Sequence, residues 1–97
     1  MSKITVPDIH QPNDVNDYDI SFDEWFPAGD VITSVVMSCA PIMVTPPTHA
    51  IDPTGRIVKV WVYAGGVHLT TYRITVRAIT SDGREKEVEL IVKVKEV

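Results

Sequence analysis

The side chains that could bind a metal through imidazole are few and widely separated. His10 lies in an N-terminal segment, His49 follows a pair of prolines, and His68 lies at a predicted turn. A protein metal site needs at least three convergent ligands, and the spacing of these histidines places no two of them on one face of a strand. The histidine pattern therefore predicts no metal centre.

Acidic side chains cluster before and within the first predicted turn. Ca²⁺ accepts carboxylate and carbonyl oxygens in loose geometry, so the cluster is a candidate for weak calcium binding, although the spacing of an EF-hand is missing. The alternative is a solvated polar arm that leads into a capped turn, and we favour it. The cluster comprises Asp14, Asp17, Asp19, Asp23 and Glu24.

The remaining groups do not form a catalytic set. Cys39 would need a histidine base and an electropositive setting to act as a nucleophile, but it ends an apolar run and is better interpreted as an inert buried thiol. Gly65-Gly66 joins two predicted strands and precedes no helix that could hold a phosphate. We therefore expect no enzyme activity and no cofactor.

One surface constellation has the chemistry of a binding site. Trp61 and Tyr63 alternate with valines along one predicted strand, and Arg73 and Arg77 alternate with apolar residues along the next. If these strands are neighbours in one sheet, the aromatic rings can stack with the guanidinium groups, and such a patch has the composition of a protein interface. The alternative is a self-contained surface ladder. We favour the interface.

The element that organises the chain is the strand that contains these arginines. From Tyr72 onward, apolar residues alternate with Arg73 and Arg77, which indicates a half-buried strand. Tyr72 is near its start, as in the tyrosine corner of immunoglobulin-like folds, where the hydroxyl can bond backbone across the sandwich. The side chains predicted to face inward are Tyr72, Ile74, Val76 and Ala78.

Similar patterns predict the other strands. They cover residues 18–22, 31–39, 42–45, 57–64 and 87–95, with a turn that contains Trp25 and Phe26 and a hairpin at 81–84. The inward residues are predicted to be Val58, Val60 and Val62, then Val88, Leu90, Val92 and Val94. Both faces of 31–39 are semi-apolar, and we favour Ile32, Ser34 and Val36 as its inward set. About seven short antiparallel strands without a helix predict an all-β, immunoglobulin-like β-sandwich.

Length and composition limit the classes of protein. The chain has 97 residues, 44% of them hydrophobic and 23% charged, as expected for one globular domain. We expect residues 1–17 to form an extended N-terminal arm with a short apolar start at Ile4 and Val6, and residues 18–97 to form the sandwich. The net charge of −4 argues against nucleic-acid binding, and no apolar run is long enough to cross a membrane. The N-terminus has no secretory signal, so we expect synthesis in the cytoplasm.

The order of several short motifs resembles a family of small tailed-bacteriophage proteins, the phage fibre-tail adaptors. The first motifs are Asp17 to Asp19, Asp23 to Trp25 and Gly29-Asp30. Trp61 then precedes a glycine pair, and the last block contains Thr71 to Arg73 and Gly83-Arg84. The resemblance covers about residues 17–95.

The resemblance implies a non-enzymatic virion component, made in the host cytoplasm and present in several copies, that joins tail or neck to fibre or neighbouring ring proteins. The arm, which the family pattern does not require, could reach an adjacent subunit, because a flexible end can become ordered on binding. The alternative function is a carbohydrate or host-receptor binding module that uses Trp61 and Tyr63 as its platform.

Overall fold

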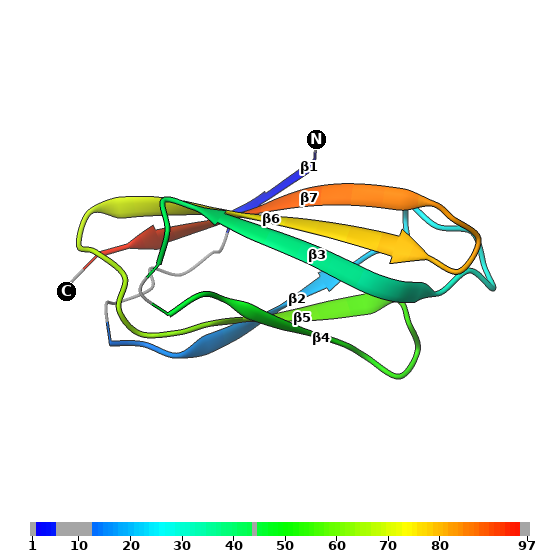
Figure 1. Cartoon of the computed structure of the whole chain (residues 1–97), viewed down its shortest axis with the longest axis horizontal. Helices are drawn as coiled ribbons and strands as arrows, with labels where there is room; N and C mark the ends of the chain where they lie inside the picture. The colour runs from blue at the N-terminus through cyan, green and yellow to red at the C-terminus, as the bar shows by residue number, and fades with distance from the viewer. Residues whose placement is uncertain (1, 6–12, 44, 96–97) are drawn as a thin grey trace.

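The computed structural model describes residues 2–5, 13–43 and 45–95, with side-chain detail from residue 13 onward, and contains seven strands in two facing sheets (Figure 1). Short loops connect the strands, as alternating patterns interrupted by proline and glycine predict. The strands are β1 (Ser2–Thr5), β2 (Asn16–Ser21), β3 (Ile32–Ala40), β4 (Thr48–Ile51), β5 (Ile57–Val62), β6 (Thr70–Thr80) and β7 (Glu85–Val94).

The strand order is that of an immunoglobulin-like sandwich. One sheet has the order β1-β7-β6-β3 and the other has the order β2-β5-β4, and these sets match the strand sets that pack face to face in immunoglobulin domains. Six strands form two antiparallel three-stranded sheets, whereas β1 pairs in parallel with β7. The predicted β-sandwich is confirmed, except that one strand of the seven is parallel.

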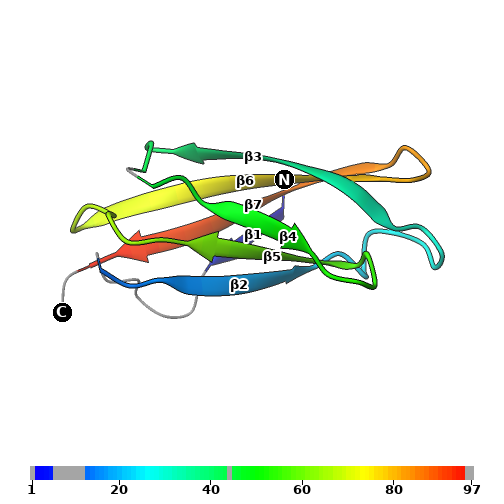
Figure 2. The ribbon, with the colours of Figure 1, turned by 60° about the horizontal axis from the view of Figure 1, so that its bottom comes forward.

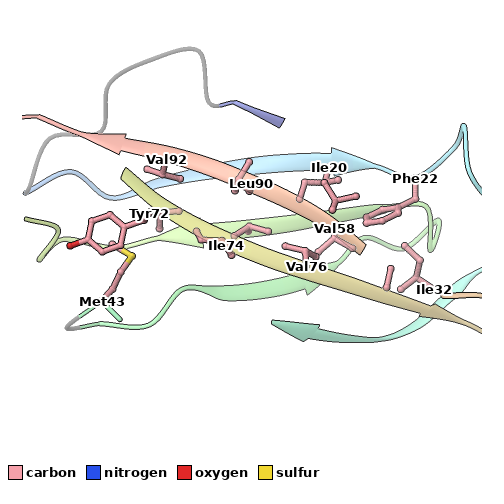
Figure 3. Packing of buried hydrophobic residues seen from close by; sticks show 14 of the residues in the cluster. Ile20, Phe22, Ile32, Met43, Val58, Tyr72, Ile74, Val76, Leu90 and Val92 are labelled. Carbon is pink, nitrogen blue, oxygen red and sulfur yellow. The ribbon is translucent and has the colours of Figure 1, made fainter. Parts of the chain in front are cut away.

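The core consists of the inward residues of β5, β6 and β7, which follow the predicted alternation. Val58, Val60 and Val62 on β5 are fully buried, and so are the predicted sets on β6 and β7 (Figure 3). Burial of each such side chain contributes roughly 1.5–3 kcal/mol. Phe22 and Phe26 stack at one end of the core, with ring centroids 5.7 Å apart; of the two aromatic residues in the predicted turn, Phe26 is buried and Trp25 is half-buried.

The inward face of β3 differs from the prediction. Ile32 is buried, but Ser34 and Val36 are exposed, and Val35, Met37 and Cys39 pack against the core. The register of β3 against β6 shifts between Ile32 and Ser34. Such a bulge adds one residue to one strand, so every side chain after it changes face.

The fourth strand is also displaced from its predicted position. Residues 42, 43 and 45 belong to no strand, and β4 begins after the Pro46-Pro47 pair, at Thr48. Met43 is buried as a loop residue and lies beside the ring of Tyr72 (Figure 3). The apolar run at 42–45 thus supplies a core side chain from a connection, which a periodic pattern does not distinguish from a strand.

Tyr72 anchors the loop before its own strand. The Val67 backbone N–H donates to the Tyr72 hydroxyl at 2.9 Å, five residues upstream. This is the local backbone bond of a tyrosine corner, and it lies within the β5–β6 loop rather than across the sandwich. Gly66 lets the backbone of this loop lie close to β7, because a Cβ at position 66 would lie only 2.9 Å from the Val94 side chain.

No helix in the described residues has the length and apolarity that a membrane span requires.

Candidate interaction surfaces

Trp61 and Tyr63 lie on the outer face of the three-stranded sheet. Trp61 occupies the central strand β5, with Asp17 of β2 and Thr48 of β4 as its cross-strand partners. Tyr63 follows the end of β5, and its hydroxyl forms a 2.7 Å hydrogen bond with Thr48 Oγ1. Both aromatic side chains are half-buried. We call Trp61 and Tyr63, with the β2, β5 and β4 residues around them, the aromatic face.

The three charges on the aromatic face are paired within the chain and together leave one net negative charge. Lys59 Nζ lies 2.6 Å from Asp17 Oδ2 and 3.1 Å from Asp19 Oδ1. The hydrogen bond from Lys59 lowers the pKa of Asp17, and the bonds to both carboxylates raise the pKa of Lys59. A partner that covers this face meets an internally paired set of charges rather than a free ion.

Arg73 and Arg77 lie elsewhere, which corrects the predicted aromatic-cationic patch. They belong to β6 in the four-stranded sheet, whereas Trp61 belongs to β5 in the other sheet. The outer faces of two packed sheets point in opposite directions, so the rings and the guanidinium groups cannot stack. Strand pairing over long sequence separations decides which sheet a strand joins, and the local pattern does not show it.

Each arginine instead has a glutamate of β7 as its partner. Arg73 Nη1 donates to Glu89 Oε1 at 2.7 Å, and Arg77 Nε donates to Glu85 Oε1 at 2.8 Å. The hydrogen bond to Glu85 raises the pKa of Arg77. The guanidinium groups on this face of β6 are therefore paired within the chain, and contact of this face with a partner stays a prediction.

The N-terminal candidates are only partly visible. Ile4 belongs to β1, where its Cα partner is Leu90 of β7, and Val6 lies outside the described residues. His10 also lies outside them. The first residues of the predicted arm thus form a strand on the sandwich of their own chain.

The acidic cluster and the thiol have structural roles in this fold. Asp23 pairs with Arg56 at 2.8 Å, and Asp17 and Asp19 pair with Lys59. Among the described residues, no three His, Cys, Asp or Glu side chains gather in a way that could hold a metal ion. Burial raises the pKa of the Cys39 thiol, which donates to the Pro41 carbonyl at 3.3 Å.

Two groups that sequence reasoning missed fix the loop between β2 and β3. Arg56 donates to the Asp23 carboxylate and to four backbone carbonyls, those of Asp23, Phe26, Pro27 and Asp30. Asp30, which is 1% exposed, accepts from Ser81, from the Asp82 backbone and from Arg84 of the β6–β7 hairpin. In the sequence, the only sign of this network is an aspartate, Asp30, directly before an apolar strand. The sequence does not show which residues bind that aspartate.

The whole-chain comparison decides the family. The family model described as podophage GP4 fiber-tail adaptor protein gp77 matches residues 10–93. The chain belongs to this fiber-tail adaptor family. No curated protein matches the chain. Family membership makes the chain a structural component of a bacteriophage virion, as the resemblance implied.

The family motifs of this adaptor chain serve two different parts of the structure. Asp17 and Asp19 flank the aromatic face, where they pair with Lys59. The Asp23–Trp25 turn, Asp30 and Arg84 meet at the other location, the end of the sandwich that Arg56 closes. Trp25 there packs its ring on Phe22 and lies 4.9 Å from the Lys86 ammonium. Most of these motifs thus lie at the stabilised end or on the aromatic face, whereas Thr71–Arg73 lies at the start of β6 in the other sheet.

The opposite end of the adaptor carries exposed apolar loop residues that the sequence patterns did not indicate. Register places the start of β2, the end of β3 and the β5–β6 loop at this end (Figure 2). A hollow of about 210 Å³ there is lined by Leu69, Lys93 and Lys95 among others. Isolated apolar residues in loops have no periodicity, so no pattern distinguishes them from core. The residues are Val15, Ile42, Val67 and Leu69, from 52% to 89% exposed.

Proposed function

We propose that this adaptor joins the tail or neck of a phage particle to a fibre or a neighbouring ring protein through its aromatic face and its N-terminal arm. It acts in several copies, as a protein-binding subunit without a catalytic step, a nucleic-acid contact or a membrane contact. The observation that carries the proposal is the half-exposed pair Trp61 and Tyr63 on a sheet face whose charges are already paired.

Physical chemistry supports this choice of face. Tryptophan and tyrosine dominate the energetic centres of protein interfaces, because they bury a large rigid area and retain a polar group. The ion pairs of Lys59 form within the chain, so a partner that covers them meets one net negative charge rather than three separate ions. The opposite sheet offers two arginines that already have glutamate partners within the chain, so neither guanidinium group is an unpaired charge for a partner to bind.

The arm, residues 1–17, is the second contact of the proposal. Its first strand, β1, adds to the edge of β7 in parallel pairing. Parallel pairing is slightly less stable per residue than antiparallel pairing, so a strand of four residues can exchange its place for a neighbouring subunit. The same edge of β7 would then receive the arm of another subunit.

The proposal is tested by incorporation into particles. In phage complemented with a Trp61→Ser/Tyr63→Ser double variant, we expect the amount of this chain per purified particle to fall roughly tenfold or more, because the hot-spot side chains are lost. The matched control is Arg73→Ser/Arg77→Ser on the other sheet, which should incorporate normally. A variant without residues 2–8 tests the arm and should also incorporate less. Normal incorporation of both the aromatic and the arm variants would refute the proposal.

One observation favours a second candidate, the carbohydrate or receptor-binding module. Trp61 has a carboxylate, Asp17, and a hydroxyl, Thr48, as cross-strand neighbours, and sugar sites combine an aromatic platform with such polar groups. This function predicts saturable binding of a glycan by the isolated chain on a glycan array, lost in Trp61→Ser. An array without a signal above that variant would eliminate it.

A further inference from the structure

The free edge of β3 has no charged residue. Residues 31–51, which include β3 and β4, contain no Asp, Glu, Lys or Arg, in a chain that is 23% charged. The other edge strands differ: β1 contains Lys3, β2 contains Asp17 and Asp19, and β4 has only four residues. Edge strands of soluble proteins are usually protected from pairing by charge, proline or short length, and β3 lacks all three.

The edge is also accessible. β3 is the last strand of the order β1-β7-β6-β3 and lies at the margin of the sandwich (Figure 2). In the described part of the chain, no strand pairs with its other side. The bulge lies before Ser34, so Ser34 to Ala40 pair with β6 in continuous register. In a strand paired on one side, alternate residues direct their N–H and C=O groups to the free side.

The residues of this edge are chemically symmetric about Val36. Ser34 and Ser38 flank it at two positions, and Val35 and Met37 flank it at one. Ser34, Val36 and Ser38 face outward, and the Val36 side chain is 54% exposed. A two-fold axis at Val36 would therefore place serine opposite serine and valine opposite valine.

We propose that two copies of this chain pair antiparallel through the Ser34–Ser38 segment of β3, with the two Val36 residues opposite each other. The four-stranded sheets then become one continuous sheet across the dimer. Cross-strand pairs of β-branched residues and of hydroxyl residues are favourable, and like charges directly opposite are unfavourable, so an uncharged segment suits pairing with itself. Val35 and Met37, which already pack against the core, become covered at the joint.

The loop after β3 limits the length of the pairing. Pro46 and Pro47 approach Met37, Ser38 and Cys39 across a hollow of about 80 Å³. Proline has no N–H to donate to a ladder, so the pairing cannot continue from β3 into the loop that contains Pro41, Pro46 and Pro47. The pairing is therefore short, and we expect weak, reversible dimerisation, as in small transient interfaces.

The test is the oligomeric state of the full chain by sedimentation equilibrium. Val36→Lys places two ammonium groups opposite each other at the axis and should raise the dimer dissociation constant roughly tenfold or more. The matched control, Val67→Lys, adds the same charge at a position 61% exposed on the β5–β6 loop, and should leave the constant unchanged. A wild-type chain that is monomeric to about 1 mM, or equal weakening by both variants, would overturn the proposal.

Disulfide trapping tests the register and does not depend on the stability of the lysine variant. Residues directly opposite in an antiparallel pair have Cα atoms about 4.5–5.5 Å apart, which suits a disulfide. In a Cys39→Ser background, Val36→Cys should form a covalent dimer under mild oxidation, and Ser34→Cys, which faces Ser38 of the other copy, should not. Equal crosslinking of the two variants would overturn the register. The contact uses neither Trp61 nor Tyr63, so dimerisation and particle incorporation fail independently.

Discussion

At the scale of single residues, Asp30 is the clearest case of a buried charge that the fold uses. Burial by itself raises the pKa of a carboxyl group, but the hydrogen bonds from Thr80, the Asp82 backbone, Arg84 and Ser81 outweigh this effect, so the pKa of Asp30 is lowered. The ionised side chain thereby connects the start of β3 to the β6–β7 hairpin. Asp30 is a structural residue rather than part of the proposed interface.

The lowered pKa of Asp30 predicts how stability depends on pH. A carboxyl group with a lowered folded-state pKa stabilises the protein above its unfolded pKa of about 3.9, and this contribution is lost as pH falls through the folded-state value. Asp30→Asn should therefore destabilise the chain at pH 7, and the difference from wild type should shrink below about pH 4. Urea unfolding of Asp30→Asn and of the wild type, at pH 7 and below about pH 4, measures this difference in the free energy of unfolding.

Asp82→Asn is the matched control, because the Asp82 side chain is 64% exposed and belongs to the same hairpin. Its free energy of unfolding should follow that of the wild type at both pH values, since exposed ion pairs contribute little. A deficit in Asp30→Asn that stays constant from neutral to acid pH would show that the residue acts by shape and not by charge.

At the scale of elements, the β2–β3 loop depends on one arginine. Arg56 supplies five hydrogen bonds to this loop, two of them to the partly buried carbonyls of Phe26 and Asp30. Arg56→Met keeps the aliphatic stem but leaves these carbonyls without a donor, so we expect a loss of about 2 kcal/mol or more in the free energy of unfolding. Arg77→Met, which breaks a pair with Glu85 whose two side chains are 45% and 47% exposed, should cost less than about 1 kcal/mol. Equal losses in urea unfolding would contradict the role of Arg56.

The elements also show how far the sequence predicts this structure. Alternation predicted the inward faces of β5, β6 and β7 correctly, because in each strand a run of uncharged, apolar residues alternates with a set that contains charged residues. It failed for β3, where both faces are semi-apolar and a bulge shifts the phase after Ile32. It also failed at 42–45, where an apolar run belongs to a loop that places Met43 against Tyr72.

The candidate site was predictable only in part for a related reason. The outward direction of Trp61 and Tyr63 follows from the valines that alternate with them. Their separation from Arg73 and Arg77 follows from which sheet each strand joins, and this depends on pairing between residues far apart in the sequence. The hydrogen bonds of Arg56 join residues far apart in the sequence, and the position of β3 at the edge of its sheet depends on strand order. Neither follows from a local sequence pattern.

At the scale of the whole molecule, the stabilising network and the candidate contact surfaces lie in different parts of the sandwich. One end is closed by Arg56 and Asp30, and the other end carries exposed apolar loops. The aromatic face and the β3 edge belong to different sheets, so the two proposed contacts, with a virion partner and with a second copy, use different parts of the surface. This arrangement suits a subunit that bridges two components of a particle, as the family description of a fiber-tail adaptor indicates.

The most direct test of this account is quantitative mass spectrometry of gradient-purified particles of the phage that encodes the chain, with copy number measured relative to the portal protein. The account predicts a fixed copy number in every preparation, in a simple ratio to the portal ring, as expected for a subunit in a symmetric assembly. Absence of the chain from clean particles, or an amount that varies between preparations, would contradict its role as a structural adaptor.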